Sequence, residues 1–107
     1  MSEKGRVVFL LTLKPGMSKQ FLEAYEGIRH EVAGGVAGHI VDQVCQSRED
    51  EDQWLITSEW ESVDDFLAWE ATEEHRDQAK PMRECFADAR SFKFVVREET
   101  RNPGGSG

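Results

Sequence analysis

Cysteine is scarce in this chain of 107 residues, which holds only Cys45 and Cys85. Two cysteines cannot build a disulfide framework or a four-ligand zinc site, so both are interpreted as small core residues of a reduced, cytoplasmic protein. Long apolar runs are missing as well, since none approaches the roughly 18 residues that span a bilayer. The first six residues lead straight into an apolar segment without a small-residue cleavage site, so we expect neither a signal peptide nor a membrane partner.

Positive charge is also in short supply. The chain has 13 Lys and Arg against 21 Asp and Glu, and its net charge of −8 disfavours nucleic-acid binding because it repels phosphate. The acidic excess is local, since residues 47–79 hold two basic and twelve acidic side chains. We expect these acids on a solvated hairpin tip and an outer helix face. A metal site is disfavoured, because consecutive loop residues rarely converge on one ion and no EF-hand glycine spacing is present.

The first half of the chain predicts a strand, a helix and a hairpin. Residues 7–13 form a continuous apolar run of strand length. Ser18 can cap a helix that Gly34-Gly35 stops. Residues 39–46 and 54–60 are then two strands, and the acidic tip between them favours a hairpin. The apolar stripe expected on the helix consists of Phe21, Leu22, Tyr25, Ile28 and Val32.

The second half predicts further helices and a last strand. Ser62 is a plausible N-cap, and a second helical start lies at Thr72. Pro81 predicts a break or a new first turn. Residues 92–97 form the fourth strand. The apolar stripe expected after the proline consists of Met82, Cys85, Phe86 and Ala89.

The element order β-α-β-β-α-β is the ferredoxin-like plan of the α+β class, a four-stranded antiparallel sheet with helices on one face. The first and last strands are apolar on both faces, so the uncovered face needs a partner, and a second copy of the sheet would give a homodimer. The enclosed space could be a dry core or a ligand cavity, and the three tryptophans favour a cavity for a flat aromatic ligand. We expect one domain over residues 1–98 and a flexible tail over 99–107.

Several short motifs stand within roughly residues 6–98: Gly38-His39-Ile40-Val41, Trp54, Trp60-Glu61-Ser62, Phe66 and His75-Arg76. Together they resemble the antibiotic biosynthesis monooxygenase domain. The resemblance implies a dimeric α+β barrel. Members include cofactor-free oxygenases that convert polycyclic aromatic phenols to quinones in polyketide pathways; others degrade haem, and related barrels include aromatic polyketide cyclases. No cofactor is expected for such oxygenation, because an electron-rich phenolate can reduce dioxygen itself.

The resemblance transfers to this sequence only in part. The tryptophan of the quinone-forming oxygenases matches Trp60, whereas their asparagine falls at Ile56 and their tyrosine at Phe66. The haem-degrading pattern matches at Trp69, but its histidine falls at Ala79 and its first strand needs an asparagine that is missing here. Haem degradation by that pattern is therefore not expected, and the usual polar set for oxygenation is incomplete.

Three residues are candidates for catalysis: His39, His75 and Trp60. Histidine is the natural proton acceptor near neutral pH, although either ring could equally lie on the surface, and Trp60 could be a core anchor. Asp42 is an outside candidate because it is a charge in mid-strand, and Tyr25 is interpreted as a core residue. The substrate-binding candidates are Trp54, Trp69, Phe9, Phe66 and Arg83, the last as a partner for a phenolate.

Three functions remain open. The first is cofactor-free oxygenation of an aromatic polyketide. The second is cyclisation of a reactive polyketone, which needs only orientation by shape and one acid or base. The third is a non-catalytic role in binding a small molecule, which the apolar residues at positions 56 and 66 make credible.

Overall fold

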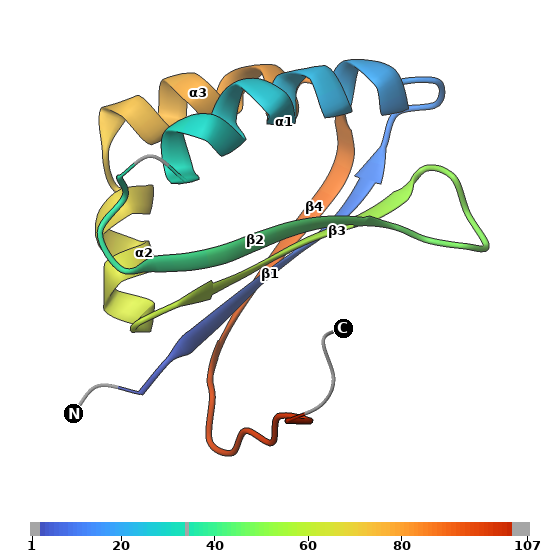
Figure 1. The fold of residues 1–107 in the computed structure, drawn as a ribbon. Helices are drawn as coiled ribbons and strands as arrows, with labels where there is room; N and C mark the ends of the chain where they lie inside the picture. The colour runs from blue at the N-terminus through green and yellow to red at the C-terminus, as the bar shows by residue number, and fades with distance from the viewer. Residues whose placement is uncertain (1–2, 34, 104–107) are drawn as a thin grey trace.

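A four-stranded antiparallel sheet carries its helices on one face (Figure 1). The computed structural model describes residues 3–33 and 35–103, apart from the side chains of residues 30–33, so the features predicted at Val32 and Gly34 lie outside the described part. The sheet order is β2-β3-β1-β4, which confirms the predicted ferredoxin-like α+β fold. The elements are β1 (Gly5–Leu13), α1 (Ser18–Ala33), β2 (His39–Gln46), β3 (Gln53–Trp60), α2 (Val63–Glu70), α3 (Glu73–Arg83) and β4 (Phe86–Val95).

Both helix starts predicted in the second half are present. The Ser62 hydroxyl accepts a hydrogen bond from the Asp65 amide at the start of α2, and the Thr72 hydroxyl accepts one from the His75 amide at the start of α3. The helical stripe predicted beyond Pro81 is wrong. Helix α3 runs through Pro81 to Arg83, and strand β4 begins soon after, at Phe86. A proline this close to the helix end removes one backbone hydrogen bond without breaking the helix.

Alternation along β1 separates the two faces of the sheet. Val7, Leu11 and Leu13 are buried beneath the helices, Phe9 lies on the same face, and Val8, Leu10 and Thr12 point to the other face. Phe21 from α1 packs edge-on against Trp54, with 5.3 Å between ring centroids, and joins Leu11 and Leu13 in one core cluster. The helix layer is therefore attached at both ends: Phe21 at one, and Phe66 of α2 against Trp60 at the other.

Strand β2 has a bulge that decides which side chains face the helices. His39 pairs with Trp60 and Val41 with Glu59, so Ile40 is an extra residue. A regular strand would put His39 and Asp42 on opposite faces. With the bulge, both lie on the helix-facing side, and His39 Nε2 comes within 3.5 Å of Asp42 Oδ1.

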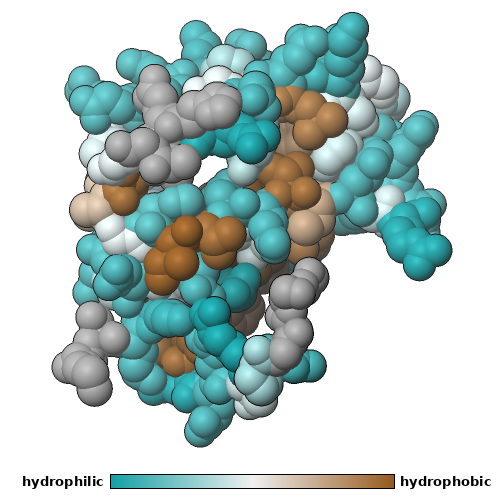
Figure 2. All heavy atoms as spheres, in the orientation of Figure 1, coloured by the Kyte–Doolittle hydropathy of each residue, from teal (hydrophilic) through white to brown (hydrophobic). Residues whose placement is uncertain are grey.

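The opposite face of the sheet has exposed apolar side chains. Val41, Phe92 and Phe94 are 41%, 38% and 55% exposed, and strand register places all three on the face without helices. In Figure 2, apolar atoms reach the surface among mostly hydrophilic ones. No helix in the described part of the chain is long and apolar enough to cross a membrane.

Residues 3–4 before β1 lie beside residues 96–97 after β4. The Val96 amide donates to the Lys4 carbonyl, and Arg97 pairs with Glu3 at 2.9 Å. The domain boundary predicted at residue 98 stays a prediction, and residues 104–107 of the predicted tail lie outside the described part. The tip between β2 and β3 is exposed at residues 48–51, as the charge pattern predicted.

Candidate functional site

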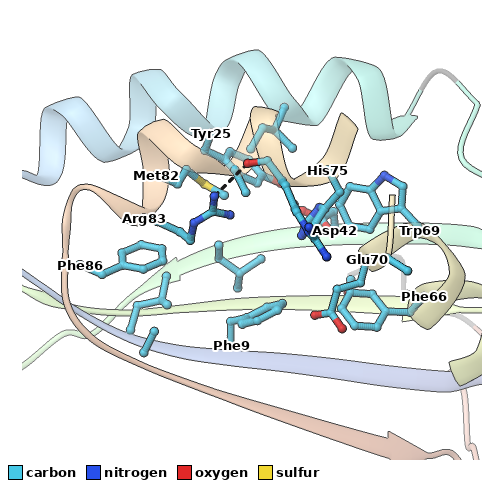
Figure 3. Close-up of a pocket in the computed structure, with 18 of the residues that line it drawn as sticks. Phe9, Tyr25, Asp42, Phe66, Trp69, Glu70, His75, Met82, Arg83 and Phe86 are labelled. Carbon is cyan, nitrogen blue, oxygen red and sulfur yellow. Dashed lines mark hydrogen bonds between the residues drawn. The ribbon is translucent and has the colours of Figure 1, made fainter. Parts of the chain in front are cut away.

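A cavity of about 590 Å³ lies between the sheet and the helices (Figure 3). Its lining is mostly apolar and aromatic, with a few polar and charged groups, which is the usual make-up of a small-molecule site. Strands β1, β3 and β4 supply Phe9, Leu11, Ile56, Ser58, Phe86 and Ala89. Helices α1 to α3, the α2–α3 junction and β2 supply Tyr25, Ile28, Asp42, Phe66, Leu67, Trp69, Glu70, Ala71, His75, Arg76, Ala79, Met82 and Arg83.

His75 is the ionisable ring in this wall. The Thr72 cap fixes its backbone in the first turn of α3, and its ring packs edge-on against Trp69 with centroids 4.2 Å apart. Burial lowers the pKa of His75 below its usual 6.5; the nearby Glu70 acts in the opposite direction, and Arg83 adds to the lowering. Its Nδ1 is buried without a hydrogen-bond partner. The imidazole is therefore neutral at physiological pH, and a neutral imidazole has one ring nitrogen that can accept a proton, as a general base requires.

Helices α2 and α3 supply three further charged side chains to the cavity: Glu70, Arg76 and Arg83. The Arg83 guanidinium donates through one nitrogen to the Arg76 carbonyl at 2.9 Å, which holds it against its own helix. An arginine has five N–H donors, so several remain for an anionic group. Arg83 is thus placed where a partner for a phenolate was expected.

Tyr25 and Asp42 add a polar pair from α1 and β2 to the same cavity. The Tyr25 hydroxyl donates to Asp42 Oδ2 at 2.5 Å. Burial, with the hydrogen bond and charge of Asp42, raises the pKa of Tyr25 above its ordinary value of 10.0. Tyr25 therefore stays protonated, and its side chain is part of the wall rather than of the dry core.

Trp60 lies behind the wall of the cavity. It is 1% exposed, its indole Nε1 donates to the Ser58 hydroxyl at 2.8 Å, and its ring packs against Phe66 and Trp69. Ser58 lines the cavity but Trp60 does not. The residue that carries the family motif thus positions lining residues rather than contacting the cavity.

His39 and Trp54 line a second hollow, of about 660 Å³, beside α1 and β2. They do not line the cavity between the sheet and the helices, which is called the main cavity below. His39 packs edge-on against Trp60, and Trp54 is 5% exposed with its indole donating to the Glu51 carbonyl. The main cavity therefore brings together five of the eight predicted site residues: Phe9, Phe66, Trp69, His75 and Arg83.

Some lining residues were not singled out from the sequence. Glu70 had no distinguishing spacing, and Arg76 was noted only as part of the His75-Arg76 motif, although Arg76 and Arg83 lie seven residues apart on α3, which is one face of a helix. Ile56 and Phe66 occupy the positions where the resemblance places an asparagine and a tyrosine, and both line the cavity. Within the described residues, no three His, Cys, Asp or Glu side chains come together in a way that could hold a metal ion.

Comparison with known proteins places these features in a family. The model of the antibiotic biosynthesis monooxygenase family matches residues 5–80. The "42.8 kDa protein in whiE locus" of Streptomyces coelicolor is 50% identical over 95 residues, which are 89% of this chain and 24% of that protein. Polyketide synthase CurD of Streptomyces cyaneus is 40% identical over 102 residues, 95% of this chain and 26% of that protein. The chain thus spans about a quarter of the length of these curated relatives.

A solved structure shows the same fold. SnoaB, a cofactor-independent oxygenase from Streptomyces nogalater, superposes with a TM-score of 0.82 at 15% identity, over 94% of this chain and 100% of that one. At this identity the likeness concerns the fold alone. The family match over most of the sheet and helices is the stronger finding, and this chain belongs to the antibiotic biosynthesis monooxygenase family.

Proposed function

We propose that the chain is an enzyme that binds an aromatic, polyketide-type small molecule in the main cavity and oxygenates it without a cofactor. The observation that carries the proposal is the cavity itself, with aromatic walls and one neutral, partly buried histidine. The family membership supports the reaction type, as does the name of CurD, a polyketide synthase, for the substrate class. A volume of about 590 Å³ is in the range of sites for drug-sized ligands.

In the proposed reaction, the protein supplies binding, a base and electrostatic stabilisation. The neutral imidazole of His75 accepts the proton of a phenol, or of its anthrone-like keto tautomer, and the Arg83 guanidinium stabilises the anion that forms. The electron-rich anion reduces dioxygen and forms a carbon–oxygen bond. A ring methylene then becomes a carbonyl: one oxygen atom of dioxygen stays on that carbon, and the other leaves as water with the two methylene hydrogens. Dioxygen is therefore the oxidant, and no other electron acceptor is required.

Oxygen consumption with an anthrone tests this proposal. We expect the wild-type protein to consume one dioxygen molecule for each quinone formed, and His75→Gln to lower the rate about 10²- to 10⁴-fold, the usual contribution of a general base. Lys19→Gln, a substitution of an exposed helix residue, serves as the control and should leave the rate unchanged. A wild-type rate equal to the spontaneous rate would count against the proposal.

A second candidate function is cyclisation on the same scaffold. It is favoured by Ile56 and Phe66, because these apolar side chains replace the polar pair expected of a quinone-forming site. A cyclase needs orientation by shape and one base, and it needs no oxygen. Turnover of a linear polyketone under anaerobic conditions would support cyclisation, and binding without any turnover would support a non-catalytic role.

The exposed apolar face of the sheet supports a homodimer in which two such faces pack together. Phe92 and Phe94 stack with centroids 6.5 Å apart, and the Arg90 guanidinium lies 5.8 Å from the centre of the Phe92 ring. This face lies opposite the helix layer, so its burial would leave the main cavity on the inside of each protomer.

A further inference from the structure

The hydrogen bond between Tyr25 and Asp42 has a direction that chemistry fixes. A carboxylate only accepts hydrogen bonds, so the Tyr25 hydroxyl must be the donor and Asp42 the acceptor. A phenol has one proton and two lone pairs. With its proton directed to Asp42, Tyr25 can offer the cavity only an acceptor.

The position of Asp42 is set by the bulge in β2 and by the neighbouring side chains. The β2 bulge turns Asp42 to the helix-facing side, opposite Ser58 of β3. Its Oδ1 lies 3.5 Å from His39 Nε2, while Oδ2 holds Tyr25. The His39 ring is held in turn against Trp60, with centroids 5.1 Å apart. Oδ2 is therefore held by the Tyr25 hydroxyl, and Oδ1 faces the buried His39 ring, whose Nε2 makes no hydrogen bond with the described residues.

The other residues that line the cavity offer few groups that could accept a hydrogen bond from a ligand hydroxyl. Arg76 and Arg83 have only donors, and His75 is proposed as the base. Ser58 already accepts a hydrogen bond from the Trp60 indole. The Glu70 carboxylate is a second acceptor, but it comes from α2, so replacing Tyr25 alone distinguishes the two. The Tyr25 oxygen differs from the two arginines, which suit an anionic or carbonyl oxygen rather than an O–H group.

We propose that Tyr25, oriented by Asp42, is the residue that recognises a protonated hydroxyl group on the ligand, by accepting its O–H hydrogen bond. The inference rests on the proposed function, because it assumes that the main cavity binds the aromatic molecule. It adds a specificity: the ligand carries a free hydroxyl that is not the one deprotonated by His75, and masking that hydroxyl as a methyl ether weakens binding.

A pair of matched probes tests this specificity. 2-Hydroxyfluorene and 2-methoxyfluorene differ only in the methyl group that replaces the hydroxyl proton, and their dissociation constants can be measured by isothermal titration calorimetry. We expect the wild-type protein to bind the hydroxyl probe about tenfold more tightly, since an unmade hydrogen bond to a buried partner typically costs about that factor. Tyr25→Phe should abolish the preference and leave the affinity for the methoxy probe within about twofold, since the ring remains.

The Asp42→Asn variant tests whether Asp42 acts by orienting the Tyr25 hydroxyl or only by packing against it. The asparagine amide can donate to Tyr25 and release the phenolic proton toward the cavity, so the preference for the hydroxyl probe should fall although Tyr25 is still present. Circular dichroism would establish that both variants keep the fold. If wild type and Tyr25→Phe show the same ratio of affinities, the inference is overturned while the proposed function stands. If the wild-type protein binds neither probe, both are overturned.

Discussion

Burial of the His75 ring links the proposed base to stability. Because burial lowers its pKa in the folded protein, the unfolded chain binds more protons as the pH falls below 6.5. Protonation therefore favours unfolding, and the contribution of a neutral His75 to stability is present above pH 6.5 and is lost as the pH falls from there toward the folded-state pKa. We predict that His75→Gln makes the free energy of unfolding less dependent on pH between about 7 and 5. Urea titrations at each pH measure it, and an unchanged pH dependence would contradict the prediction.

The roles of individual aromatic residues were only partly predictable. Trp69 and Phe66 were expected at a ligand site, and both line the cavity between the sheet and the helices. The sequence did not show whether the motif residue Trp60 contacts the cavity, because this depends on Phe66 and Trp69, which cover its ring. The side of the sheet that His39 faces was also undetermined, since a bulge reverses it.

The turn before β2 packs against the start of α2, so a substitution in this turn measures how much the contact stabilises the fold. Gly38 has φ +83°, a conformation that costs side chains energy, and an added Cβ would lie 2.3 Å from an Asp65 carboxylate oxygen. Its carbonyl also accepts from the Glu61 amide at 2.7 Å. We predict that Gly38→Ala lowers the free energy of unfolding by about 1–3 kcal/mol. Gly27→Ala, inside α1 with open space around it, is the matched control and should be neutral or stabilising in the same denaturation series.

Bulges explain where the prediction of elements failed. In β4 the pairing shifts between Leu13–Phe86 and Thr12–Asp88, so Ala87 is an extra residue and Phe86 and Ala89 share the helix-facing side. Three-residue spacing on one face imitates a helix, which is why this segment was predicted as helical. The other three strands and the element order were predicted correctly from apolar runs and turn residues, and the caps of α2 and α3 from Ser62 and Thr72.

At the scale of the whole molecule, the unpartnered sheet face predicts a dimer. Burying Phe92 and Phe94 against a second copy would remove them from water. We predict that the wild-type protein sediments at twice the chain mass of 12.2 kDa and that Phe94→Glu sediments as a monomer. Leu22→Glu replaces a similarly exposed apolar residue on the helix side and should stay dimeric. A monomeric wild type at micromolar concentration in analytical ultracentrifugation would contradict this prediction.

The proposed chemistry of the whole molecule requires that the aromatic ligand occupies the space between the sheet and the helices. A crystal structure of the protein with 2-hydroxyfluorene tests this requirement most directly. We predict electron density for the ring system against Phe9 and Phe66, within reach of the His75 imidazole and with the hydroxyl on Tyr25. Density in the second hollow beside His39 and Trp54, with the main cavity free of ligand, would contradict it.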